Sequence, residues 1–104
     1  MAQQTQIGSH KTSVFTEDGL TKVVYHHTAV VKFNADIITL DSGGWFTNTT
    51  KTRMNQASSQ FDLGFIVYQK DFDWYVKFEG QGIDTDFYDG ITFDRRFEPV
   101  QQVY

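Results

Sequence analysis

Residues 42–78 read SGGWFTNTTKTRMNQASSQFDLGFIVYQKDFDWYVKF. In order, they contain a glycine turn (Gly43, Gly44), one segment with a helical pattern, and two runs rich in β-branched and aromatic residues. Further β-like runs lie on both sides of this stretch. We therefore expect a turn, a helix and a hairpin at the centre of a chain that is otherwise made of strands.

The helix is predicted over Thr47–Phe61. At 100° per residue, one side of it carries Thr50, Met54, Ala57 and Phe61. The opposite side carries Thr52, Asn55, Gln56 and Ser59. The first side is expected to pack and the second to face solvent. Asn48 or a neighbouring threonine is expected to cap the first turn. The segment is short and weakly apolar, so its stability must come from packing on a sheet.

Before the helix, β-like runs are found at Thr21–His27, Ala29–Phe33 and Ile37–Leu40. The residues Asp18 and Gly19 form a turn signal ahead of the first run, and Asn34–Asp36 supplies a hairpin turn between the last two. Trp45 follows two glycines and precedes a polar run. Its ring is expected to be buried, because it must find its neighbours in space.

After the helix, Gly64–Lys70 and Asp73–Glu79 are expected to form a hairpin. In the second strand Trp74, Val76 and Phe78 alternate with polar positions, which predicts one core face and one solvent face. Glycine marks a loop at residues 80–84. Phe87–Phe97 is expected to be a last strand, interrupted at Gly90.

This order of elements predicts an α+β fold, with one short helix packed across one face of a largely antiparallel sheet. The chain has 104 residues, which fits a single domain, and ten Phe, five Tyr and two Trp suffice for one core. We expect a flexible N-terminal segment over residues 1–13 and one domain over residues 14–104.

Several classes of function are excluded or disfavoured by composition. Because the chain has no cysteine, it has no disulfide, thiolate zinc site, iron–sulfur cluster or cysteine nucleophile. Neither a signal segment nor an apolar run of about 18 residues is present, so a location in the cytoplasm of a host cell is expected. The net charge is −4, and the carboxylates concentrate in residues 61–104, which disfavours a uniformly basic nucleic-acid binder.

Five short motifs follow one another through the middle half of the chain: Gly43-Gly44-Trp45, Thr49-Thr50-Lys51, Arg53-Met54-Asn55, Val67-Tyr68-Gln69-Lys70 and Trp74-Tyr75-Val76. In this order they resemble a family of small proteins of unassigned function from bacteriophages and prophages. The resemblance implies a phage accessory protein. It brings no catalytic residues and no cofactor with it, so binding is expected in place of catalysis.

The first candidate site is the turn and helix start from Gly43 to Asn55. Its candidate residues are Gly43, Gly44, Thr49, Thr50, Lys51, Arg53 and Asn55. Free amides at a helix start, together with hydroxyls and cations, suit a nucleic-acid backbone or a host protein. The spacing is not that of a P-loop. The alternative is a capped helix without any ligand.

The second candidate is an acidic face within residues 71–94. Its carboxylates include Asp71, Asp73, Asp84, Asp86 and Asp89, and Lys77 is the single cation in this range. Such a face suits docking on a basic host protein, as a decoy or inhibitor. The alternative is a role in solubility and in protecting sheet edges. The aspartate spacing does not match a calcium loop, so no metal is expected.

A third hypothesis is an enzyme that uses His26 or His27 as an acid–base residue. Adjacent residues on a strand point to opposite faces, so these two histidines are not expected to chelate one metal. No nucleophile or carboxylate at a diagnostic spacing accompanies them. A surface histidine is the alternative.

Overall fold

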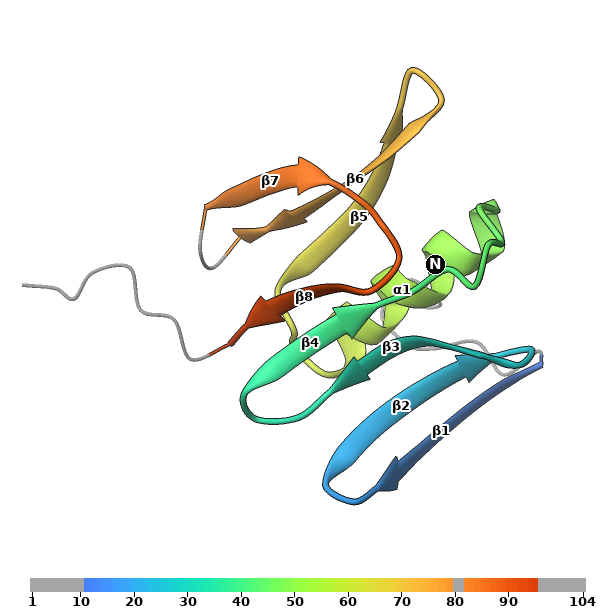
Figure 1. The fold of residues 1–104 in the computed structure, drawn as a ribbon, viewed down its shortest axis with the longest axis vertical. Helices are drawn as coiled ribbons and strands as arrows, with labels where there is room; N and C mark the ends of the chain where they lie inside the picture. The colour runs from blue at the N-terminus through green and yellow to red at the C-terminus, as the bar shows by residue number, and fades with distance from the viewer. Residues whose placement is uncertain (1–10, 80–81, 96–104) are drawn as a thin grey trace, which may run out of the picture.

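The computed structural model describes residues 11–79 and 82–95, and within them the chain forms one helix and eight strands (Figure 1). They follow in the order β1 (Thr12–Glu17), β2 (Leu20–Tyr25), β3 (Thr28–Phe33), β4 (Ile37–Leu40), α1 (Asn48–Gln60), β5 (Phe65–Lys70), β6 (Asp73–Phe78), β7 (Ile83–Asp86) and β8 (Ile91–Asp94). The α+β fold with antiparallel strands is confirmed.

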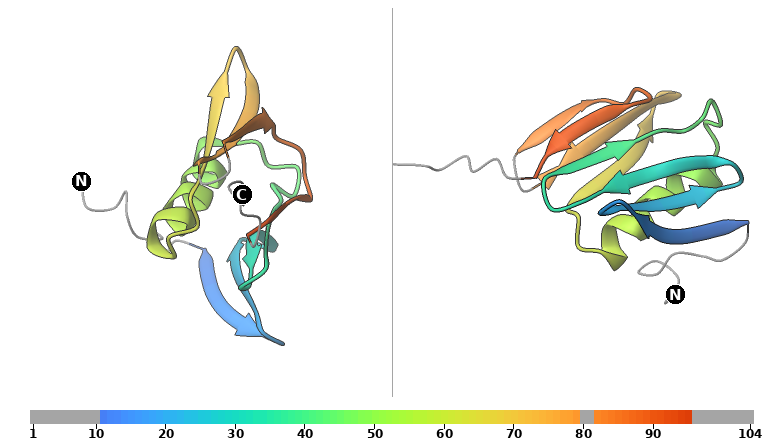
Figure 2. Two further views of the ribbon diagram at one scale, coloured as in Figure 1. Left: turned by 90° about the vertical axis from the view of Figure 1, so that its left-hand side faces the viewer. Right: turned by 60° about the horizontal axis from the view of Figure 1, so that its bottom comes forward.

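The strands form two sheets, where one was expected. The large sheet has the order β1-β2-β3-β4-β8 and the small sheet has the order β5-β6-β7, with every neighbouring pair antiparallel. Helix α1 lies along one side of both sheets (Figure 2). It contacts β5 of the small sheet and both β2 and β3 of the large one. The helix is therefore held by two sheets.

The predicted last strand, Phe87–Phe97, is correct only over β8, because the chain changes sheet at the predicted interruption at Gly90; residues 96 and 97 lie outside the described residues. The amide of Phe87, one residue past the end of β7, donates to the carbonyl of Trp74 on β6, so this residue is still bonded to the small sheet. The amide of Gly90 donates to Leu40 on β4. Gly90 has a φ of 88°, which a glycine adopts without strain, and β8 follows it in the large sheet.

Helix α1 begins and ends close to the predicted limits. Thr47 is the N-cap, and its Oγ1 accepts from the amide of Thr50 at 3.2 Å. Thr50, Met54 and Ala57 are fully buried, as the helical pattern predicted. Gln56 was expected to face solvent but is only 5% exposed. Its side-chain oxygen accepts from Arg53, which bonds Thr12 on β1 and lies over Tyr25 on β2, so Gln56 lies on the side of the helix that faces the large sheet.

The helix also covers the outer edge of the small sheet. Among the described strands, β5 pairs only with β6, so one row of its backbone groups needs other partners. The side-chain amide of Asn55 supplies them at Val67, where it donates to the carbonyl (2.9 Å) and accepts from the amide (2.7 Å). The hydroxyl of Ser58 does the same at Phe65. Two polar helix residues thus replace a neighbouring strand.

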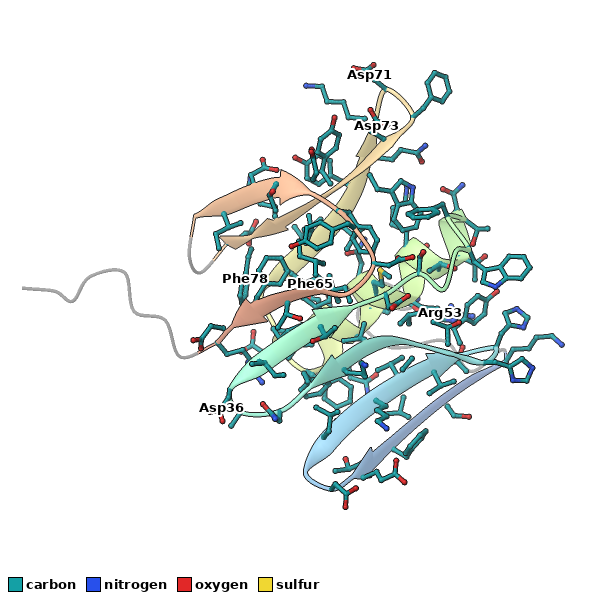
Figure 3. The ribbon with its side chains drawn as sticks, in the orientation of Figure 1. Asp36, Arg53, Phe65, Asp71, Asp73 and Phe78 are labelled. Atoms are coloured by element: carbon teal, nitrogen blue, oxygen red, sulfur yellow. The ribbon has the colours of Figure 1, made fainter. Side chains whose placement is uncertain are left out.

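One hydrophobic core joins the two sheets and the helix. Phe78 on β6 contacts Phe93 on β8, with ring centroids 4.9 Å apart, and Figure 3 shows Phe65 and Phe78 inside the molecule. The buried side chains of this core include Val23, Val31, Ile38, Leu40, Met54, Ala57, Phe65, Val67, Trp74, Val76, Phe78, Ile91 and Phe93.

Two strands were not predicted. Thr12 and Ser13, placed in the expected flexible segment, belong to β1 and pair with β2; the remaining part of that segment up to residue 10 lies outside the described residues. Strand β7 occupies a region expected to be a loop up to Asp84. Both strands are edge strands whose side chains are mostly exposed, so they lack the apolar pattern that marks a buried strand.

Candidate functional site

The glycine turn does not bury Trp45, so that prediction is wrong. The indole is 62% exposed and the neighbouring Phe46 is 54% exposed. The turn closes on itself, because Asp41 accepts from the amide of Gly43 and Ser42 accepts from that of Gly44. Helix α1 starts at Asn48, soon after the turn, and the Trp45 ring stays on the surface.

The turn is held tightly against β3. A Cβ atom on Gly43 would lie 2.2 Å from Oγ1 of Thr28, and the φ of Gly43 is 66°. Only glycine fits this position without displacing its neighbour. The position of Phe46 therefore depends on a turn that the large sheet fixes.

Three residues of the first candidate site are used inside the fold. Thr50 is fully buried, and Asn55 bonds the β5 backbone. Arg53 donates from Nε to Thr12 Oγ1 (3.0 Å) and from Nη1 to Gln56 Oε1 (3.2 Å), and its guanidinium carbon lies 5.6 Å from the Tyr25 ring centroid. In Figure 3 it lies between α1 and the large sheet.

The other four residues of that site lie nearer to solvent. Gly43, Gly44 and Thr49 are exposed and Lys51 is half-buried. The Lys51 amino group donates to Gln69 Oε1 (3.3 Å) and lies 5.7 Å from the Trp74 ring centroid. The structure thus does not bring the seven predicted residues together on one surface.

A groove lies where the helix start faces the small sheet. It has a volume of about 480 Å³, and we call it the aromatic groove. It is lined by Phe46, Gln69, Phe72, Asp73, Trp74, Tyr75, Asp86 and Phe87.

Three rings form a contacting cluster inside this groove. The ring centroids of Phe46 and Trp74 are 5.0 Å apart, those of Trp74 and Phe87 are 5.5 Å apart, and those of Phe46 and Phe87 are 6.1 Å apart. Trp74 and Phe87 are buried, whereas much of Phe46 remains accessible. The groove therefore has a fixed aromatic floor and an exposed aromatic wall.

Phe72 stands beside the groove at the end of the β5–β6 hairpin, which projects beyond the rest of the molecule (Figure 1). Asp71 and Phe72 form a two-residue turn with φ values of 53° and 74°. Such turns favour Asn-Gly, and a positive φ is strained for a bulky residue. The ring of Phe72 is 93% exposed, so burial within this chain does not offset the strain.

Four of the five predicted acidic residues gather near this hairpin. Asp73 and Asp86 line the aromatic groove, and Asp71 and Asp84 line an adjoining hollow on the small sheet. Figure 3 shows Asp71 and Asp73 at the end of the hairpin. Asp89 lies elsewhere, because its Oδ1 accepts from the amide and the hydroxyl of Ser42, both at 2.8 Å.

The carboxylates give the groove a negative field. Partial burial raises the pKa of Tyr75, and the charges of Asp73, Asp86 and Asp71 raise it further. In the part of the chain that the structure describes, the side chains of Asp73 and Asp86 make no ion pair or hydrogen bond. Their charges are therefore available to a ligand.

The two histidines occupy the turn between β2 and β3, not a strand as expected, and both are exposed. His26 has a φ of 59° and its amide donates to the carbonyl of Lys11. The hollow beside them is lined by Lys11, Thr12, Ser13, His26 and His27, none of which is a carboxylate. Among residues 11–79 and 82–95, no group of His, Cys, Asp or Glu is placed to hold a metal ion.

The aromatic groove was not predicted from the sequence. Phe46 and Phe87 carry no local signal, because contacts distant in sequence make them neighbours. Phe72, in contrast, does carry a local sequence signal. A phenylalanine in a two-residue loop contradicts the chemistry of that turn, and such contradictions concentrate at functional sites.

No helix in the described ranges is both long enough and apolar enough to span a bilayer. No curated protein and no solved structure gives a match to the chain. The family model described as Kyanoviridae Gp96 protein matches residues 1–94. Because this match covers most of the sequence, the chain belongs to the Kyanoviridae Gp96 family, a family of phage proteins.

Proposed function

We propose that the protein is a phage accessory protein that binds a host protein non-covalently, in the cytoplasm of the host cell, through the aromatic groove and Phe72. The observation that carries this proposal is Phe72 itself, a strained residue whose ring is 93% exposed beside a ready-made aromatic groove. Aromatic side chains on well-ordered elements are typical of residues that dominate binding energy at interfaces.

The geometry favours a protein partner over a nucleic-acid backbone. Arg53 and Asn55 are occupied by Thr12, Gln56 and the β5 backbone. Lys51 lies over Trp74, and the carboxylates of the groove would repel phosphate. The sequence suggests two separate binding surfaces, the turn before α1 and the acidic face. Both border the aromatic groove, the turn through Phe46 and the acidic face through Asp73. A single partner bound at the groove can therefore contact both surfaces.

Catalysis receives less support than binding. The hollow at His26 and His27 contains no carboxylate to orient or activate an imidazole. The aromatic groove contains carboxylates and rings but no nucleophile beside a base.

The proposal is tested by capture from host lysate on the immobilised protein, with and without nuclease. We expect a protein that the parent retains after nuclease treatment and that Phe72→Asn fails to retain. Asparagine tolerates a positive φ, so this variant should keep the fold and show an unchanged or raised melting temperature.

Phe15→Thr is the matched control, because Phe15 is an exposed phenylalanine on β1 of the large sheet. Its capture should equal that of the parent. Capture that depends on intact nucleic acid, or equal capture by the parent and Phe72→Asn, would contradict the proposal.

A further inference from the structure

We propose that the aromatic groove receives an arginine side chain from a basic segment of the partner, and that Asp73 and Asp86 neutralise its guanidinium group. This inference rests on the proposed function and identifies the chemistry that the groove recognises. It does not depend on the identity of the host protein.

The walls of the groove suit a flat cation. Phe46 and Phe72 are the exposed rings among its lining residues, and Trp74 and Phe87 form the floor between them. A cation is attracted to an aromatic face within about 6 Å of the ring centroid. The volume of about 480 Å³ also lies in the range of small-ligand pockets.

The fold already places one cation against this cluster. The Lys51 amino group lies 5.7 Å from the Trp74 centroid, where Gln69 Oε1 also holds it. This contact shows that the aromatic floor accommodates a positive charge on one side. Lys51 approaches from helix α1 and leaves the accessible surface of Phe46 and Phe72 uncovered.

The carboxylates of the groove make no ion pair in the described part of the chain, although Lys70 lies opposite Asp73 in the β5–β6 hairpin and Lys51 lies over Trp74. Tyr75 pairs with Asp86 across β6 and β7, and Asp73 is two residues away on β6, so both carboxylates lie beside the Tyr75 ring, on the face of the small sheet opposite to Trp74, and border the groove at its rim. Neither makes an ion pair or a side-chain hydrogen bond. Carboxylates that make no ion pair within the chain can attract a cationic ligand, so charge complementarity to such a ligand is a role that fits them.

Arginine fits this combination better than lysine. Its guanidinium is planar, stacks on aromatic rings and keeps its N–H donors in the plane, where carboxylates at the rim can accept them. It is also more weakly hydrated than an ammonium group, so it loses less on entering a groove lined by rings.

The inference is tested by titrating the full chain with nona-arginine and nona-lysine peptides, using calorimetry for affinity and amide NMR shifts for location. We expect tighter binding of nona-arginine, with shifts at Trp74, Tyr75, Asp86 and Phe87. The double variant Asp73→Asn/Asp86→Asn should weaken nona-arginine by about tenfold or more, the effect of removing charged partners at an interface.

The control is Asp18→Asn/Asp62→Asn, which changes the net charge equally. Both positions are exposed and have a φ of 55°, which asparagine tolerates. It should change the affinity less than about twofold, because removal of distant surface charge has a weak, screened effect. Equal weakening by the two double variants, equal affinity for nona-lysine, or shifts confined to another surface would overturn the inference.

The two proposals fail in different ways. If Phe72→Asn abolishes host-protein capture while nona-arginine ignores the groove, the arginine assignment falls and the proposed function stands. If Phe72→Asn captures the host protein as well as the parent does, the proposed function falls.

Discussion

The covered edge of β5 gives a stability prediction with an internal control. Ser58 and Ser59 are adjacent on helix α1, but only Ser58 bonds the sheet: its hydroxyl donates to the Phe65 carbonyl (2.7 Å) and accepts from the Phe65 amide (3.0 Å). Ser58 is buried and Ser59 is exposed. Alanine at position 58 leaves both backbone groups of Phe65 without a partner in a site closed to water.

Each unsatisfied buried group costs about 1–3 kcal/mol. The better helix propensity of alanine returns at most about 0.5 kcal/mol. With two such groups, we therefore expect Ser58→Ala to lower the free energy of unfolding by about 1.5–5.5 kcal/mol, a large share of the roughly 5–15 kcal/mol of a typical domain. Ser59→Ala should leave it unchanged or raise it by up to about 0.5 kcal/mol.

Urea denaturation of the two variants and the parent measures this difference through the transition midpoint at constant slope. A Ser58→Ala variant within about 0.5 kcal/mol of Ser59→Ala, the range of an ordinary surface change, would refute the view that α1 serves as the missing neighbour of β5.

Two further predictions concern the turn and the tyrosines. Gly43→Ala should destabilise more than Gly44→Ala in the same assay, because a Cβ at position 43 meets Thr28 at 2.2 Å whereas position 44 is open; equal losses would show that only the positive φ matters. The Tyr68 hydroxyl donates a hydrogen bond to Asp84 (2.5 Å), which raises the pKa of Tyr68 above its ordinary value of 10.0. The stability that this hydrogen bond contributes is therefore fully present below the unfolded-state pKa and is lost as the pH rises through the folded-state pKa. Absorbance titration should show a lower pKa for Tyr68 in Asp84→Asn, and an unchanged titration would contradict this cause.

The features predicted correctly from the sequence are local ones. The helix has its cap at Thr47 and its packed residues at helical spacing. The β3–β4 hairpin has turn residues between its strands, and the β5–β6 hairpin joins two runs rich in β-branched and aromatic residues. Each of these signals lies within a few neighbouring residues, where backbone preference and side-chain period act directly.

The division into two sheets depends on contacts that no local pattern encodes. β8 pairs with β4 across about half of the chain, and the sequence of β8 is compatible with either sheet. The predicted solvent side of the helix is wrong at Asn55 for the same reason, because the sequence does not reveal that the small sheet lies there. It is also wrong at Gln56, which lies beside Arg53 toward the large sheet.

The candidate site was predicted in part. Asp73 and Asp86 were singled out by charge, but their proximity depends on β7, whose sequence IDTD has one apolar residue and reads as a loop. Trp45 is predicted to be buried because its ring has few neighbours in sequence and must find them in space. The glycine turn instead holds the segment on the surface and presents Phe46 to the groove.

The most direct test of binding through Phe72 is to measure by calorimetry the affinity of the purified host partner for the parent and for Phe72→Asn. The titrations are made at a temperature at which both proteins are folded. Loss of an interface residue that dominates binding costs about 2 kcal/mol or more, which corresponds to roughly a 30-fold change in Kd. We expect at least that loss, with the unfolding midpoint of Phe72→Asn equal to or above that of the parent. An unchanged Kd would show that the exposed ring of Phe72 takes no part in recognition and would contradict the proposed function.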